Sequence, residues 1–90
     1  MLAWRPTPAN LQRLAQRAPV SEFEHGVRHT LLPGQQVVIA PLCIHLFVNL
    51  SPATSVGTNF ECPASRAALT WLEQHRQKPW HAQIAQLLSV

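Results

Sequence analysis

The sequence predicts a small α+β domain, in which an antiparallel sheet of about four strands lies between an N-terminal helix and a C-terminal helical hairpin. Residues 21–60 carry short runs of β-branched and aromatic side chains, separated by turn residues roughly every eight to twelve positions. The flanking residues, 1–20 and 61–90, place apolar side chains three and four positions apart, as helices do. With 90 residues in all, these three segments are expected to form one domain.

The N-terminal helix is predicted to begin at Thr7, whose hydroxyl can cap the first turn. Pro8 follows at a position where a missing N–H costs nothing, and Leu11 and Leu14 continue at helical spacing. Pro19 lacks the N–H that a further turn needs, so we expect the helix to end there.

The central region is predicted to be extended. Pro33 and Gly34 indicate a type II turn, because Pro sets φ at the first central position and Gly supplies the positive φ at the second. The β-branched run from Val37 to Ile39 predicts a strand that is buried on both faces. The expected extended segments are residues 23–32, 35–40, 44–50 and 54–60, with tight connections at 40–43 and 51–53.

The C-terminal hairpin is predicted to open at Pro63 and to turn at Lys78 and Pro79. Its first helix has an apolar face formed by Ala68, Leu69, Trp71 and Leu72. Its second helix has an apolar stripe formed by Trp80, Ile84, Leu87 and Leu88. His75 and His81 are expected on solvated faces of these helices.

Composition indicates the kind of partner. Hydrophobic residues make up 47% of the chain and charged residues 12%, which is more apolar surface than so small a core can hide. We therefore expect a homodimer. The net charge of +3 comes from scattered basic residues and not from a patch, so nucleic acid is not an expected partner.

No stretch of the sequence predicts a signal peptide or a membrane span. The first residues lack an apolar core segment, and the longest apolar run, 37–50, is interrupted by Pro41 and His45. Cys43 and Cys62 have no metal-ligand or redox-motif spacing and are expected to be reduced thiols. Together these features favour a cytoplasmic protein without membrane contact.

About thirty residues of the central region follow a recognisable order of motifs. Leu32–Pro33–Gly34 is followed by a segment that runs from Val37 to His45, and then by Asn49–Leu50–Ser51, Ser55–Val56 and Asn59–Phe60. This order and spacing resemble the second half of a JmjC-like cupin barrel, the double-stranded β-helix of many Fe(II)- and 2-oxoglutarate-dependent oxygenases. The sequence departs from the family pattern at Ala40, Leu42 and Cys43–Ile44, where the family has Pro, Gly and an aromatic pair.

The resemblance implies roles for two residues. His45 corresponds to the second metal-binding histidine of the family, and Asn59 to a polar residue at the barrel mouth that can contact a ligand. The family takes its first histidine and its carboxylate from an upstream His-x-Asp or His-x-Glu motif. That motif is missing here, because the chain has no Asp and Glu follows no histidine at that spacing. The barrel's first half is also not expected, since only about thirty residues precede the matched block.

Other residues could complete a metal site around His45. His25 and His29 would share a face on a helix, but on a strand this spacing separates their Cα atoms by about 13 Å. Glu22 or Glu24 could supply a carboxylate across a strand pair.

The sequence also allows roles for His45 that do not involve a metal ion. Its ring can instead be held by a backbone carbonyl or by Asn49, as in many half-buried histidines. Cys43 is expected as a small buried apolar residue, and a nucleophilic Cys43–His45 pair on one strand face remains an alternative.

Two functions follow from these features. The first is a self-associating binding or assembly module that has lost metal-dependent catalysis and needs no cofactor. In the family that it resembles, helices after the barrel often form a dimer interface, so the expected interface is Trp80, Ile84, Leu87 and Leu88. The alternative is an oxygenase that uses Fe(II) and 2-oxoglutarate, or another metal-dependent cupin, with its site completed across a dimer interface.

Overall fold

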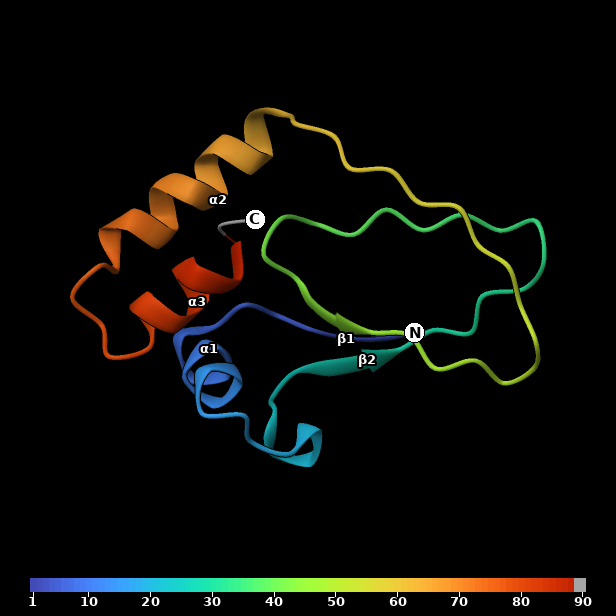
Figure 1. Ribbon diagram of the computed structural model, residues 1–90, viewed down its shortest axis with the longest axis horizontal. Coiled ribbons are helices and arrows are strands. Elements are labelled where there is room, and N and C mark those ends of the chain that lie inside the picture. The colour runs from blue at the N-terminus through green and yellow to red at the C-terminus, as the bar shows by residue number, and fades with distance from the viewer. Residues whose placement is uncertain (89–90) are drawn as a thin grey trace.

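Residues 1–88, which the computed structural model describes, form a three-stranded antiparallel sheet beside three α-helices (Figure 1). This confirms the α+β class, whereas the sheet has three strands and not about four. In chain order the elements are β1 (Leu2–Trp4), α1 (Pro8–Ala15), a 3-10 turn (Val20–Glu22), β2 (Gly26–Arg28), β3 (Ile44–Leu46), α2 (Pro63–Gln74) and α3 (His81–Leu88). The last two positions of the predicted hairpin, 89 and 90, lie outside the described residues.

The strand β1 lies at the centre of the sheet, although the sequence did not predict it. Ala3 is opposite Val27 of β2 on one side and opposite His45 of β3 on the other. Trp4 pairs with Gly26, and a Cβ atom on Gly26 would lie 2.6 Å from the indole Nε1 of Trp4. Glycine is therefore required where the Trp4 ring crosses β2.

The predicted N-terminal helix is present as α1 and begins as expected. The Thr7 hydroxyl accepts a hydrogen bond from the backbone N–H of Asn10 at 3.1 Å. The helix ends at Ala15, before the predicted stop at Pro19, because Arg17 has a φ of 55°. Ala18 then donates its N–H to the carbonyl of Arg13 at 2.9 Å, which closes the helix with a Schellman motif.

Asn10 joins α1 to the residues that lead into β2. Its side-chain nitrogen donates to the carbonyls of Arg5 at 2.9 Å and Glu24 at 2.8 Å, and its side-chain oxygen accepts from the Glu24 N–H at 2.9 Å. Asn10 is fully buried, so these bonds satisfy polar groups that water does not reach.

The predicted helical hairpin is present as α2 and α3, and it supplies most of the core. Leu72, Trp80 and Ile84 are buried together with Leu11 of α1. Ile44 of β3 packs against this cluster and links the sheet to the helices. On the apolar face predicted for α2, Leu69 is exposed instead.

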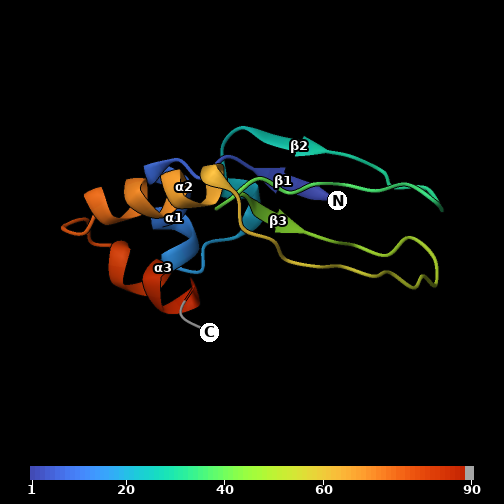
Figure 2. The same cartoon turned by 90° about the horizontal axis from the view of Figure 1, so that it is seen from above.

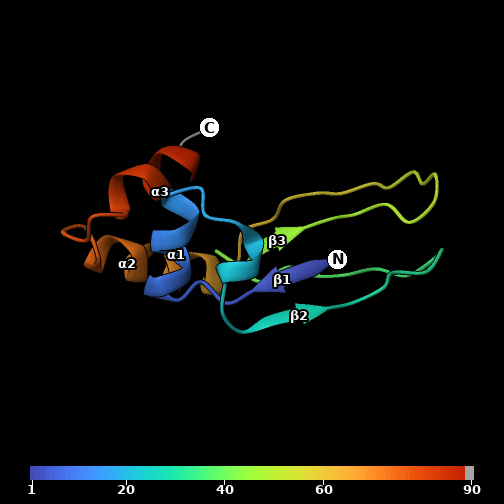
Figure 3. The same ribbon diagram turned by 90° about the horizontal axis from the view of Figure 1, so that it is seen from below.

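Two long extended connections follow β2 and β3, and we call them the first arm (residues 29–43) and the second arm (residues 47–62). Both arms run out from the sheet on the side away from the helices and then return (Figures 2 and 3). They contain the predicted strands 35–40 and 54–60, which form no ladder within residues 1–88. The run expected to be buried on both faces is open to solvent at Val38, which is 76% exposed.

Because of the arms, the molecule is less compact than a typical globular chain of the same length. The radius of gyration is 14.3 Å, whereas a compact chain of this length has about 12 Å. The helices and sheet thus form a small packed body, and the arms add extended backbone to it.

Candidate functional site

His45 lies on β3, one of the two edge strands of the sheet. Its ring is exposed, its Nδ1 lies 3.0 Å from the carbonyl oxygen of Cys43, and Phe47 contacts it edge-on at 5.8 Å between ring centroids. In the tautomer whose Nδ1–H donates this bond, Nε2 keeps a free lone pair. Metal-bound histidines are oriented in the same way.

The other candidate ligands lie apart from His45. His25 and His29 flank β2 at opposite ends, and β2 is separated from β3 by β1, about 10 Å for two strand spacings. The Glu24 carboxylate is 3.3 Å from the Arg13 guanidinium, and Glu22 lies in the 3-10 turn before β2.

Within the part of one copy that the structure describes, these residues do not come together as a metal site. Among residues 1–88, no three His, Cys, Asp or Glu side chains are grouped so that they could hold a metal ion. Asn59, the candidate ligand-binding residue, is exposed on the second arm. Residues 1–88 of one copy thus do not bring together the two histidines and one carboxylate that Fe(II) needs.

Cys43 does not form the nucleophilic pair that its spacing from His45 allows. Its Sγ lies 3.7 Å from the carbonyl oxygens of Trp4 and Ile44, and the His45 ring contacts the carbonyl and not the thiol. Beside Cys43 is an open hollow of about 240 Å³, bordered also by Ala3 and Val27 of the sheet.

The fold buries two of the four residues of the predicted helical interface and leaves the other two exposed. Trp80 and Ile84 are each 3% exposed and belong to the core of this chain. Leu87 and Leu88 are exposed at the end of α3, so they are the part of the stripe that a partner can reach.

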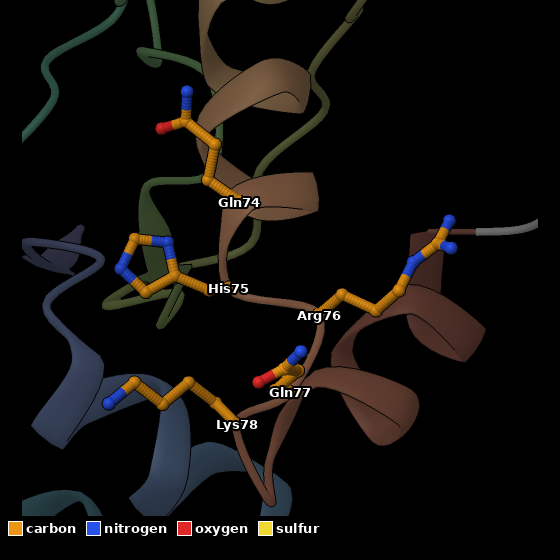
Figure 4. Close-up of a pocket in the computed structure, with 5 residues that line it drawn as sticks. All are labelled: Gln74, His75, Arg76, Gln77 and Lys78. Atoms are coloured by element: carbon orange, nitrogen blue, oxygen red, sulfur yellow. The ribbon is translucent and has the colours of Figure 1, made fainter.

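The loop between α2 and α3 surrounds a second open hollow of about 430 Å³. Figure 4 shows that His75 and Lys78 extend to one side of this loop and Arg76 to the other. Arg76 pairs with Glu73. His75 is half-buried, not solvated as predicted, because its ring lies 4.2 Å from that of Trp71 and its Nδ1 contacts the Trp71 carbonyl. The cations do not converge on one point, so the hollow lacks the geometry of an anion site.

Cys62 is the N-cap residue of α2. A hydrogen bond with the Ser65 hydroxyl, together with the nearby backbone N–H groups of Ser65 and Ala64, lowers the pKa of the Cys62 thiol. A thiolate at a helix N-terminus is stabilised in this way.

The arms carry most of the exposed apolar side chains. Between Arg28 and Glu61 the sequence has no Lys, Arg, Asp or Glu, although most of these residues belong to the arms and not to the packed body. The large side chains at least half exposed on the arms are Leu32, Val38, Phe47, Val48, Leu50, Val56 and Phe60. An uncharged apolar surface of this extent is typical of a surface that another polypeptide covers.

The backbone of the arms forms few hydrogen bonds with the rest of the described chain. Between residues 29 and 61, the bonds between backbone groups outside the sheet are those that join His29 to Met1 and those that close the turns at 32–35 and 40–43. Unpaired strand backbone next to apolar side chains is a template for pairing with another chain.

Comparison with known proteins gives no relative: the chain matches no family model, no curated protein and no solved structure. Within residues 1–88, no helix has the length and apolar character that crossing a bilayer requires.

The sequence predicts an interface on the tail helices and a buried sheet at residues 35–40, whereas the structure leaves Val38 and other apolar side chains of the arms exposed. The signal was present, since a long run without charge is unusual for residues that face water. It was read as buried sheet because β-branched residues favour strands wherever a partner strand is available.

Proposed function

We propose that this protein is a self-associating assembly module, whose arms are covered by the arms of a second copy. The observation that carries the proposal is the size of the uncovered surface. The accessible area is 7368 Å², whereas a compact monomer of this mass exposes about 5,300 Å².

The excess of about 2,000 Å² is comparable to what a stable interface needs. A standard protein–protein interface buries about 800 Å² on each partner, and permanent dimers bury more. The arms supply this area with side chains that are apolar and uncharged, as in the centre of a permanent interface.

The charge distribution favours a second copy as the partner. A self-associating surface brings the same patch of two copies together, so charges of one sign in that patch oppose association unless each meets an opposite charge. The chain has a net charge of +3, yet none of its Lys, Arg, Asp or Glu residues lies between positions 29 and 60. Two copies can thus bring their arms together without placing like charges side by side.

The backbone of the first arm supports descent from a JmjC-like cupin. Gly34 has a φ of 82°, and the Gln35 N–H donates to the Leu32 carbonyl at 3.1 Å, as the predicted turn requires. Leu42 has a φ of 62° at the position where the family has glycine. A left-handed conformation is costly for leucine and free for glycine, so this turn is compatible with the glycine of the family pattern.

The test is the mass of the protein in solution across a wide concentration range, by light scattering and analytical ultracentrifugation. We expect twice the chain mass of 10.1 kDa. Replacing exposed Leu50 and Val56 by Ser should weaken the association, whereas replacing exposed Leu69, on α2, should not. A wild-type protein that stays monomeric at high concentration would contradict the proposal.

A metal-dependent oxygenase with its site shared between two copies is the second candidate. It is favoured by the free Nε2 of His45, with Nδ1 held by a backbone carbonyl. Calorimetric titration with Fe(II) or Ni(II), in wild type and in His45→Ala, tests it. Stoichiometric binding that is lost in the variant supports this candidate, and absence of binding by the dimer removes it.

A further inference from the structure

The first arm contains a segment with the form of a strand. Residues 35–40 lie between the two turns at 32–35 and 40–43, each closed by a backbone hydrogen bond of 3.1 Å. Val37 and Ile39 are half-buried, whereas Gln36, Val38 and Ala40 are exposed. This alternation has the period of two that a strand with one covered and one open face shows.

The backbone of this segment has no partner in the described part of the chain. No hydrogen bond involves an N–H or carbonyl group from residues 36 to 39. Strand-forming residues usually have these groups paired, because pairing is what makes an extended backbone stable.

We propose that two copies pair antiparallel through residues 36–40, about a twofold axis that passes beside Val38. This inference rests on the proposed self-association and specifies how the copies meet. Val38 then lies opposite Val38 of the partner subunit, Val37 opposite Ile39, and Gln36 opposite Ala40.

The register follows from the alternation. In an antiparallel pair, opposed residues share a face, so half-buried positions must meet half-buried ones. Centring the axis on Val38 satisfies this rule and places β-branched residues opposite each other. Centring it on Val37 also keeps the faces aligned, but it places the polar Gln36 opposite Val38.

The flanking residues limit the pairing to this segment. Pro33 and Pro41 lack the N–H that a longer ladder would need. The segment has no charge, so the twofold axis brings no like charges together. A short, closed ladder between two copies is the arrangement that these features allow.

Cysteine cross-linking tests the register. In a background of Cys43→Ser and Cys62→Ser, which keeps the mass and circular dichroism of the wild type, Val38→Cys should form a disulfide dimer on mild oxidation. Gln36→Cys should not, because the two copies of this residue are about 14 Å apart along the strands. A mixture of Gln36→Cys and Ala40→Cys chains should form the mixed disulfide.

A second variant tests the same interface without cross-linking. Val38→Lys alters a side chain that is 76% exposed, so the fold of one copy should be unaffected. Two facing lysines should weaken dimerisation about 100-fold or more, whereas Val38→Thr, which keeps β-branching, should weaken it far less.

The outcomes separate this inference from the proposed function. A dimer that persists in Val38→Lys, or one in which Gln36→Cys cross-links with itself, would overturn the strand pairing and leave self-association standing. Wild-type assemblies larger than a dimer would overturn the closed twofold arrangement. A wild-type monomer would overturn both.

Discussion

Asn10 holds α1 against the loop before β2, and its replacement tests whether the packed body depends on that contact. Asn10→Ala removes three hydrogen bonds of 2.8 to 2.9 Å, to the Arg5 carbonyl and to both backbone groups of Glu24. Each contributes about 1 kcal/mol net, so we expect a loss of about 3 kcal/mol. Domains of this size lose about 4 to 8 °C per kcal/mol, so the melting temperature should fall by about 12 to 24 °C.

Asn10→Asp distinguishes the donors from the acceptor. The carboxylate keeps the bonds from the Glu24 N–H and the Arg13 guanidinium but places a negative oxygen against the Arg5 and Glu24 carbonyls, so at neutral pH it should be less stable than the wild type. Protonation restores one donor, so its deficit should shrink as the pH falls, while that of Asn10→Ala should not.

Urea and thermal unfolding at one protein concentration measure these effects, because association would otherwise contribute to the stability. Gln83→Ala, on the exposed face of α3, is the matched control and should change the free energy of unfolding by less than about 0.5 kcal/mol. An Asn10→Ala deficit no larger than this control would refute the reasoning.

Two further predictions concern the sheet and the start of α2. Gly26→Ala should cost about 1 to 3 kcal/mol in unfolding experiments, because the new Cβ would meet the Trp4 indole at 2.6 Å. Gly57→Ala, where a Cβ has nothing within 4 Å, should be close to neutral, and equal effects of the two changes would contradict the packing described. With Cys43 replaced by Ser, Ser65→Ala should shift the alkylation–pH profile of Cys62 to higher pH, since the Ser65 hydroxyl is the largest cause of the lowered thiol pKa. An unchanged profile would mean that this hydrogen bond is not formed.

Local signals in the sequence predicted the helices and turns. Thr7 with Pro8, Pro63 and the Pro33–Gly34 turn each act through the residues beside them, and each lies where it was expected. The strand Leu2–Trp4 could not be predicted in this way. It is three residues long, and it is a strand because β2 and β3 pair with its two edges.

The difference between local signals and contacts between distant segments also explains why the exposed surfaces differ from those predicted. Residues 35–40 have the composition of a strand, but a ladder depends on a partner that composition does not identify. The stripe on α3 was predicted correctly as apolar, yet Trp80 and Ile84 face the core because Leu11 and Leu72 pack against them. Amphipathicity shows which face is covered and leaves open whether the covering residues belong to the same chain.

The placement of the arms also bears on metal chemistry. His45 is on an edge strand beside the arms, so a second copy that covers the arms would approach the same edge. Association therefore precedes any metal site that needs donors from two chains, and the mass measurement should be made before metal titrations are interpreted.

Hydrogen exchange at the backbone amides of residues 36–39, followed over a range of protein concentrations, tests most directly whether a second copy covers the arms. Because these amides have no acceptor in one copy, all of them should exchange at unprotected rates in dilute protein. As the dimer forms, alternate amides of the segment, either Gln36 and Val38 or Val37 and Ile39, should become protected, because one partner strand reaches only every second N–H, while the amides of α1 stay protected throughout. Unprotected exchange of residues 36–39 in a protein whose mass is that of a dimer would contradict the account.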